Sequence, residues 1–161
     1  MVQAGIFVVI GVIVVSMAAA MYMYTEYQTN YIIVKEGETV SVGPVEYAIS
    51  FDGTHKGNKA NMPENIFLKI RIIAKNLSDE RTNMSGGQFY LVDEKEQRHQ
   101  PTYGGFSADD LLNVWLEPNK PVMVTTQFDV AYDEGKKYSV VIRPTKQQST
   151  TDTALVCIIN C

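Results

Sequence analysis

The feature that most constrains this chain is an uncharged apolar run near its amino terminus, residues 4–24, AGIFVVIGVIVVSMAAAMYMY. The run contains no proline, and as a helix rising about 1.5 Å per residue it would reach about 30 Å, the hydrocarbon thickness of a bilayer. A buried strand pair is a poor alternative, because a run of this length without a turn residue has no sheet to fit into. The sequence therefore predicts one transmembrane helix over residues 1–24.

Tyrosines gather at the carboxyl end of this run, where an aromatic belt is expected at the lipid headgroups, and the first charge is Glu26. Ser16 and Ala20 have the small-xxx-small spacing that favours helix pairing, so self-association through the helix is a further expectation. The side chains that we expect to form the membrane anchor are Ile6, Val9, Ile13, Met17, Tyr22 and Tyr24.

Two other interpretations of the run stay open. A cleaved secretory signal has a basic segment before a shorter apolar core; Ala18-Ala19-Ala20 resembles a cleavage site, but the first basic residue is Lys35. A pilin-like or archaellin-like subunit would bury the same helix in a filament core and carry a β-domain outside. The basic residues and processing site that normally precede such a helix are missing from Met1-Val2-Gln3.

The net charge of the chain and its glycosylation sequons indicate which partners it can bind and on which side of the membrane its domain lies. The fourteen basic and eighteen acidic residues give a net charge of -4, and the absence of a basic stripe argues against nucleic acid as a partner. Neither flank of the run carries a Lys/Arg cluster, so the positive-inside rule sets no orientation. Two Asn-x-Ser sequons begin at Asn76 and Asn83, and glycosylation there requires an extracytoplasmic face. We expect a single-pass protein of the cell membrane with its domain outside.

From residue 25 onward the chain reads as β. A polar neck over residues 25–38 leads into strands whose apolar residues recur with a period of two. In residues 66–76, one face carries alternating isoleucine, leucine and alanine, and the other carries Lys69, Arg71 and Lys75. These cations are either an anion-binding stripe or a solvated face, and the charge pattern favours the solvated face. The predicted strands are 31–35, 39–42, 45–51, 66–76, 89–92, 114–116, 122–130, 138–142 and 154–160.

Two loops stand out between these strands, and we expect them to contact partners. Residues 52–65 form a long exposed loop, and residues 101–113 contain a short helical segment that Ser107 caps. Asp109 and Asp110 would lie near the positive end of that helix. The alternative use of these two acids is a calcium site, but no EF-hand spacing and no third nearby acid supports it.

Short strands at spacings of about ten residues predict an all-β protein, an immunoglobulin-like antiparallel sandwich of seven or eight strands over residues 39–161, preceded by one N-terminal transmembrane helix. This order resembles the immunoglobulin-like DUF4352 domain, which occurs on lipoproteins and single-pass membrane proteins of bacteria and archaea. The resemblance is carried by Val42-Gly43 before the strand with Tyr47, residues 70–78 ending Lys75-Asn76-Leu77-Ser78, Phe89-Tyr90-Leu91-Val92-Asp93, Leu116-Glu117-Pro118-Asn119, and Phe128-Asp129-Val130.

The chain departs from the DUF4352 pattern at Asn119, where glycine is usual, and in its tail beyond Pro144. The resemblance implies a prokaryotic protein, and we expect an archaeal one. The plan also resembles archaellum stator proteins, in which a membrane helix presents an immunoglobulin-like domain to the surface layer.

The tail ends in two cysteines, Cys157 and Cys161. In a fully extended strand their Cα atoms would lie about 13 Å apart, beyond the roughly 7 Å that a disulfide allows, so a bond forms only if the end of the chain curls back. A disulfide would fit an oxidising exterior. A binuclear copper site is rejected, because the histidines, His55 and His99, both lie upstream.

The sequence lacks a glycine-rich phosphate loop, a G-x-S-x-G elbow and an H-E-x-x-H motif, so we expect no enzyme and no cofactor. The function it favours is a membrane-anchored extracytoplasmic interaction module, an accessory subunit of a membrane or cell-surface complex. Its expected partners are the lipid bilayer and other membrane or cell-surface subunits. The alternatives are a subunit of a pilus-like or archaellum-like filament or a surface-layer-binding stator, and a ligand or metal sensor using Asp109 and Asp110.

Overall fold

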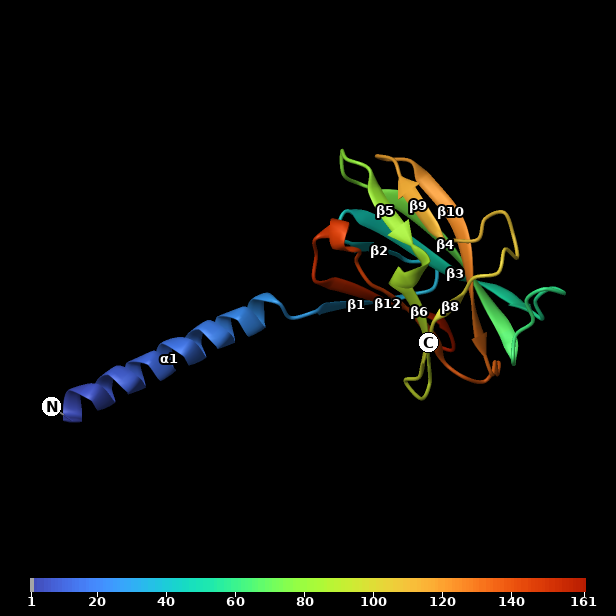
Figure 1. The fold of residues 1–161 in the computed structure, drawn as a ribbon. Helices are drawn as coiled ribbons and strands as arrows, with labels where there is room; N and C mark the ends of the chain where they lie inside the picture. The colour runs from blue at the N-terminus through green and yellow to red at the C-terminus, as the bar shows by residue number, and fades with distance from the viewer. Residues whose placement is uncertain (1) are drawn as a thin grey trace.

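A long amino-terminal helix leads into a β-sandwich and projects away from it (Figure 1). The structure, a computed structural model, describes the backbone of residues 2–161 and the side chains from residue 5 onward. The helix α1 (Val2–Glu26) is the one helix within these residues that is long and apolar enough to cross a membrane, and no part of that apolar stretch is buried against the domain. All six expected anchor side chains lie on α1, and each is more than half exposed.

Twelve strands and two short 3-10 turns follow the helix. They are β1 (Asn30–Lys35), β2 (Thr39–Val42), β3 (Val45–His55), β4 (Ile66–Asn76), β5 (Thr82–Ser85), η1 (Gly86–Gln88), β6 (Phe89–Asp93), β7 (Arg98–His99), β8 (Pro101–Thr102), β9 (Asn113–Leu116), β10 (Pro121–Val130), β11 (Tyr138–Ile142), η2 (Lys146–Gln148) and β12 (Asp152–Ile159). The count exceeds the expected seven or eight because several strands are only two to four residues long.

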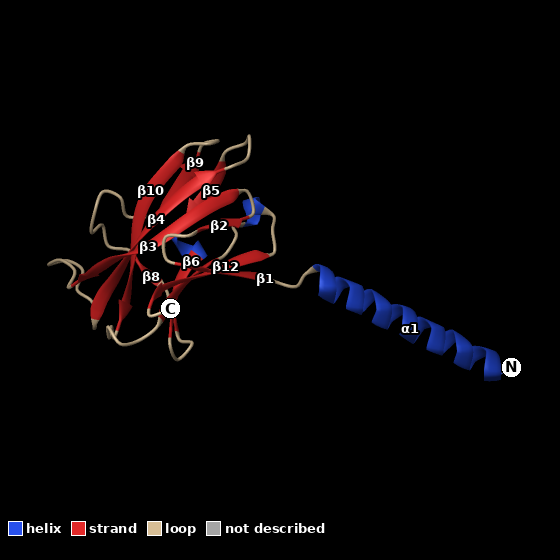
Figure 2. Cartoon of the chain, turned by 180° about the vertical axis from the view of Figure 1, so that it is seen from behind, coloured by secondary structure: helices blue, strands red, loops and turns tan. Residues whose placement is uncertain are grey.

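The strands form two five-stranded sheets, β1-β12-β11-β6-β7 and β2-β3-β4-β10-β8, and β5 pairs with β9 as a separate ladder (Figure 2). Neighbouring strands in the sheets run antiparallel except β1 and β12, which run parallel with Asn30 opposite Asp152 and Lys35 opposite Cys157. The first strand of the domain is therefore bonded to its last strand. The expected fold class, an all-β sandwich preceded by an apolar helix, is confirmed.

The core lies between the two sheets and follows from the period-two pattern. In β4 the alternate residues Leu68, Ile70, Ile72 and Ala74 are completely buried, as predicted. Matching inward positions on β11 and β12 are buried in the same cluster. Burying this much apolar surface is the main favourable term for a domain of this size.

Buried amides cross-link the two turns to the core. The Gln88 Nε2 donates to the carbonyl of Arg143 (2.8 Å) and to Oε1 of Gln148 (3.0 Å), and the Gln148 Nε2 donates to the Tyr47 hydroxyl (3.1 Å). Burial raises the pKa of Tyr47 to about 12, although hydrogen bonding by Gln148 and Gln88 acts in the opposite direction. Tyr47 is therefore neutral at physiological pH, and the network fixes η1 and η2 against the sandwich.

The connection from the helix is shorter than the expected neck of residues 25–38. The Tyr27 N–H still donates to the carbonyl of Met23 (3.1 Å), and the Asn30 N–H already donates to Thr151 in the sheet (3.2 Å). Only Gln28 and Thr29 lie between these two hydrogen bonds, so most of the neck belongs either to α1 or to β1.

The loop expected at residues 52–65 begins later, because β3 continues to His55. A bulge between Phe51 and Thr54 admits Asp52 and Gly53, whose φ of 95° suits glycine. The Asp52 carboxylate then pairs with Lys69 (3.3 Å) and Arg71 on β4. The two cations thus share one carboxylate within the sheet face, and this pairing argues against an anion-binding stripe.

The prediction of a helical segment around Ser107 is wrong. Residues 107–110 form a single turn in which the Asp110 carboxylate accepts hydrogen bonds from the Phe106 and Ser107 N–H groups. The chain then pairs with β10: Thr125 N–H donates to Asp109 O, and Leu111 N–H donates to Thr125 O, both at 2.8 Å. Sheet pairing takes the backbone groups that a second helical turn would need.

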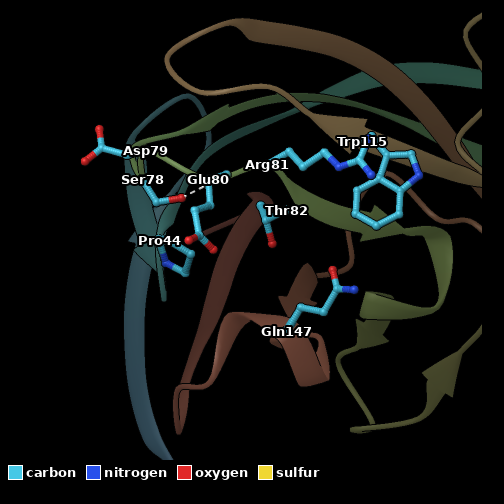
Figure 3. Close-up of a pocket in the computed structure, with 8 residues that line it drawn as sticks. All are labelled: Pro44, Ser78, Asp79, Glu80, Arg81, Thr82, Trp115 and Gln147. Carbon is cyan, nitrogen blue, oxygen red and sulfur yellow. Dashed lines mark hydrogen bonds between the residues drawn. The ribbon is translucent and has the colours of Figure 1, made fainter.

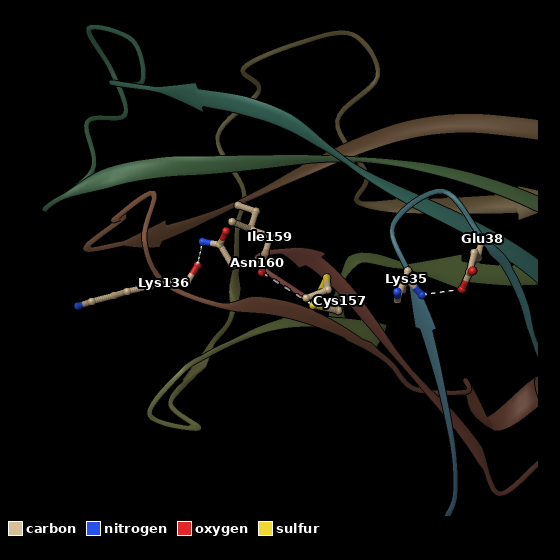
Figure 4. The surroundings of a disulfide bond; sticks show 7 residues. Lys35, Glu38, Lys136, Cys157, Ile159 and Asn160 are labelled. Atoms are coloured by element: carbon tan, nitrogen blue, oxygen red, sulfur yellow. Dashed lines mark hydrogen bonds between the residues drawn. A yellow bond between two sulfur atoms is a disulfide. The ribbon is translucent and has the colours of Figure 1, made fainter.

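Cys157 and Cys161 form a disulfide with their Cα atoms 5.7 Å apart (Figure 4). The chain curls back at Asn160, which has a φ of 52°, and the Asn160 amide donates to the carbonyls of Glu134 and Lys136. Asparagine tolerates this left-handed conformation. The last strand, predicted at 154–160, runs from Asp152 to Ile159 and lies inside its sheet between β1 and β11.

Replacing Gln148 with leucine should lower the free energy of unfolding by about 2–4 kcal/mol, because it leaves buried groups of Gln88 and Tyr47 without partners. The matched control is Gln147→Leu, since its neighbour Gln147 is exposed and should change stability by less than about 0.5 kcal/mol. Urea unfolding of the full chain in detergent micelles measures both. Equal effects would contradict the role of the network.

Candidate functional site

A hollow of about 810 Å³ lies where four segments meet (Figure 3). Pro44 comes from the β2–β3 turn, residues 78–82 lead from β4 into β5, Trp115 is on β9 and Gln147 is on η2. We call this hollow the Trp115 groove. Its lining residues are Pro44, Ser78, Asp79, Glu80, Arg81, Thr82, Trp115 and Gln147.

Trp115 is exposed because of its position in a two-stranded ladder. Leu116 beside it is fully buried, so the alternation of β9 turns Trp115 outward, where its side chain is 48% exposed. The Arg81 guanidinium lies 4.8 Å from the centre of the indole ring. This cation–π contact holds the arginine across one face of the ring.

Asn76 builds the loop that forms one wall of the groove. Its side-chain Nδ2 donates to the carbonyls of Glu80 (2.7 Å) and Leu116 (3.1 Å), and its Oδ1 accepts from the Ser78 N–H (3.0 Å) and hydroxyl (2.8 Å). Asn76 is completely buried. A glycan at Asn76, one of the two possible glycosylation sites, would not fit this folded arrangement, because the nitrogen that it would occupy is enclosed and hydrogen-bonded.

The second sequon residue, Asn83, is half-buried on β5, and its amide donates to the side chain of Asn113 on β9. Its glycosylation stays a prediction.

The groove is polar apart from its tryptophan and proline. In Figure 3 the side chains of Glu80, Gln147 and Thr82 point toward the space between Pro44 and Trp115. Thr82 is 5% exposed, and its hydroxyl has no hydrogen-bond partner among the described residues. The groove thus combines an aromatic platform with hydrogen-bond donors and acceptors, and its lining contains no histidine, the side chain most often used as a general acid or base.

The two loops expected to contact partners lie against each other. The Phe106 ring is 4.9 Å from Phe67 and 5.3 Å from His55, centre to centre, and the Asn61 amide donates to the carbonyl of Gly104 (2.8 Å). Burial and then the nearby charge of Lys69 lower the pKa of His55, against Asp110, which raises it. His55 is a neutral packing residue in this cluster.

Asp109 and Asp110 do not combine with further ligands. Asp110 is occupied by its own turn, where its carboxylate also accepts from the Ser107 hydroxyl at 2.9 Å. In the part of the chain that the structure describes, no group of three or more His, Cys, Asp and Glu side chains is placed to hold a metal ion. The arrangement offers calcium too few oxygen ligands.

His99 lies in a different turn, where its Nε2 is 3.2 Å from Asp93 Oδ2. Burial opposes the charged form of Asp93, but hydrogen bonds from Gln97, His99 and Lys95 outweigh it and lower the pKa of Asp93. This pair stabilises the β6–β7 turn.

Sequence reasoning missed the Trp115 groove, although part of its signal was present. Residues 114–116 were predicted as a strand, and alternation about a buried leucine would have turned the tryptophan outward. The rest of the groove could not be predicted, because its other lining residues are far apart in the sequence and meet only through the sheet pairing. They are Pro44, residues 78–82 and Gln147.

Comparison with known proteins gives one family and several structures. The model of the family described as "Domain of unknown function (DUF4352)" matches residues 34–153, about three quarters of the chain. No curated protein matches in sequence.

Three solved structures share the sandwich. The yjhA protein from Bacillus subtilis is 19% identical, with a TM-score of 0.63 over 77% of this chain and 98% of that one. The putative lipoprotein ycdA from the same organism is 17% identical, with a TM-score of 0.57 over 77% of this chain and 38% of that one. MPT63, a secreted protein from Mycobacterium tuberculosis, is 8% identical, with a TM-score of 0.58 over 83% and 100%. At these identities the likeness shows the fold.

Replacing Asn76 with alanine should lower the free energy of unfolding by about 2–4 kcal/mol, because it removes four hydrogen bonds at a buried position. Since Trp115 is the only tryptophan in the chain, its fluorescence reports the groove directly, and we expect a shifted emission maximum in the folded variant. Asn83→Ala, the matched sequon control, should change stability by less than about 1 kcal/mol. An Asn76 variant as stable as the Asn83 variant would contradict this assignment.

Proposed function

Because this chain belongs to the DUF4352 family, a family of sandwich domains with no assigned chemistry, we propose a binding role for it. The protein acts as a membrane-anchored, extracytoplasmic interaction module and serves as an accessory subunit of a membrane or cell-surface complex. It has no catalytic role. The observation that carries the proposal is the exposed Trp115–Arg81 pair in a polar groove.

The anchor rests on α1. Its side chains between residues 6 and 24 carry no charge, are apolar apart from Ser16 and the tyrosine hydroxyls, and are exposed along the whole length of the helix. Exposing so much contiguous apolar surface to water is unfavourable, and a bilayer removes that cost. Tyr22, Tyr24 and Tyr27 lie at the end next to the domain, where the headgroups would be.

The extracytoplasmic position is supported by the disulfide. Cys157 and Cys161 are bonded, and such bonds persist in oxidising compartments. Two of the structures that share the fold are described as a putative lipoprotein and as a secreted protein. An acidic, well-packed domain outside the membrane agrees with both observations.

A role in binding follows from the residue types in the groove. Tryptophan and arginine are the residues most enriched at energetic hot spots of protein interfaces, and they act best where surrounding groups exclude water. Trp115 presents a broad apolar face, and Arg81 is already held in place by the ring, so it loses little conformational freedom on binding. The partner is therefore a protein or other cell-surface polymer that covers Trp115.

Replacing Trp115 with alanine should abolish co-purification of the partner in mild detergent, because it removes the aromatic platform at the centre of the contact, worth about 2 kcal/mol or more. The control is Met123→Ala, since Met123 on β10 is similarly exposed (52%) and lies outside both the groove and the two loops expected to contact partners. Size-exclusion chromatography of the tagged chain from its native membrane is the measurement. A wild-type chain that elutes alone, or polymers in negative stain, would speak against the accessory-subunit role.

In intact cells, a maleimide reagent should fail to label Cys157 and Cys161 until a reductant is added, because the two sulfurs are bonded. A Thr151→Cys variant provides an exposed thiol that shows whether the reagent reaches the domain. If a membrane-impermeant reagent labels that thiol, the domain is outside. Labelling of Cys157 and Cys161 without reduction would place the domain in a reducing compartment and contradict the proposal.

A further inference from the structure

The first strand of the domain, β1, is an open sheet edge. It pairs only with β12, and within the described chain no strand lies on its other side. In a parallel ladder, alternate residues direct their N–H and C=O groups to the same neighbour. The Asn30 N–H donates to the carbonyl of Thr151 beside β12, so the backbone N–H and C=O groups of residues 30, 32 and 34 point toward β12. Those of Tyr31, Ile33 and Lys35 point away from it, toward the open edge.

The backbone groups of one of these three residues already have hydrogen-bond partners. The Lys35 N–H donates to the Glu38 side chain (2.8 Å), and the Lys35 carbonyl accepts from the Glu38 N–H (3.1 Å; Figure 4). The backbone groups of Tyr31 and Ile33 stay open, and their side chains are 61% and 72% exposed. Natural proteins usually protect such edges with proline, charges or bulges, and β1 has no protection before Lys35.

The sheet face beside this edge is apolar, and three cationic side chains lie on it or at its border. Ile33 continues a cross-strand row through Leu155, Val141 and Tyr90. The Arg98 and Arg143 guanidinium groups lie over the Tyr90 ring, at 5.3 and 4.7 Å, and Lys35 stands at the end of β1. A strand added at the edge would extend the apolar row and bring its far end close to Lys35.

The anchor determines which chains can reach this edge. α1 and β1 follow one another along nearly the same line in Figure 1, and two residues separate their hydrogen bonds. With the helix in a membrane and Tyr27 at the headgroups, the open edge at Tyr31 therefore begins within about 14 Å of the headgroups and faces sideways, toward chains in the same membrane.

A second copy does not fit this edge with the usual symmetry of homodimers. Antiparallel pairing of two β1 strands would send the two anchors in opposite directions. Parallel pairing about a two-fold axis would set Tyr31 opposite Tyr31, with donor against donor.

We propose that β1 accepts an added strand from a different membrane protein, supplied by an extended segment directly next to that protein's membrane span. This segment carries apolar residues at alternate positions, in line with Ile33, and a carboxylate opposite Lys35. The added strand bonds to the backbone of Tyr31 and Ile33, and charge complementarity with Lys35 at the end of β1 sets its direction. The proposal depends on the membrane anchorage proposed above but not on the Trp115 groove.

The test places a photoreactive benzoylphenylalanine at Tyr31 of the full chain in its native membrane and maps cross-linked peptides by mass spectrometry. The expected product is a single partner polypeptide, cross-linked within about ten residues of one of its membrane spans, as the reach from the headgroups requires. The Ile33→Pro variant removes an outward N–H and leaves the β1–β12 bonds intact, because proline is tolerated at an edge position of this kind. It should reduce the cross-link about tenfold, the loss of one backbone hydrogen bond.

Ile33→Glu is the second variant, in case proline perturbs folding. It keeps the backbone and should also reduce the cross-link, since it places a carboxylate in line with the apolar residues of the added strand. Trp115→Ala is the control and should leave the cross-link unchanged, which separates this site from the groove. Carbonate extraction of the same cells tests the anchorage independently. Cross-links to lipid, to a second copy or to segments remote from any membrane span would overturn the proposal, as would a yield that Ile33→Pro and Ile33→Glu leave unchanged.

Discussion

The parallel pairing of β1 with β12 is the constraint on which the rest of the molecule depends. It bonds the strand that follows the apolar helix to the last strand of the sandwich, so the two ends of the domain close one sheet together. The disulfide and the Asn160 amide then hold the end of β12 against the β10–β11 turn. Without this pairing, the helix would be joined to the domain by a flexible segment, and the edge at Tyr31 and Ile33 would not exist.

Buried amides determine the shape of the domain where apolar packing cannot. Gln88 and Gln148 bind η1 and η2 to Tyr47, and Asn76 holds the loop that forms one wall of the Trp115 groove. Each of these side chains is almost completely buried and makes several hydrogen bonds. Satisfied networks of this kind specify one arrangement of the chain, because any other arrangement would leave a buried donor or acceptor without a partner.

Much of the fold could be predicted from the sequence because its signal is local. Period-two alternation located β4 and β10 to within one residue, an apolar run located β12 to within two, and the absence of charge and proline in residues 4–24 predicted α1. The extension of β3 to His55 could not be predicted, since it depends on Asp52 meeting Lys69 and Arg71 across the sheet. The turn at residues 107–110 was misassigned for a related reason: helix capping is a local pattern, whereas pairing with Thr125 is a distant one.

The candidate site was less predictable than the fold. A sequon at Asn76 looks the same whether its amide is exposed or enclosed, and only the carbonyls of Glu80 and Leu116 decide between the two. The groove itself is assembled from four segments that sheet pairing brings together. The curl at Asn160 that allows the disulfide was recognised as a condition, but sequence alone could not show that it was met.

The three-residue connection between α1 and β1 also decides how the molecule carries a mechanical load. If a partner seated on the groove pulls the domain away from the bilayer, the tension enters along β1 and meets the ladder to β12 lengthwise. The bonds between these two strands are then sheared together, and they cannot open one after another as in a peeled hairpin. The sandwich is thus built to stay folded while tethered under strain.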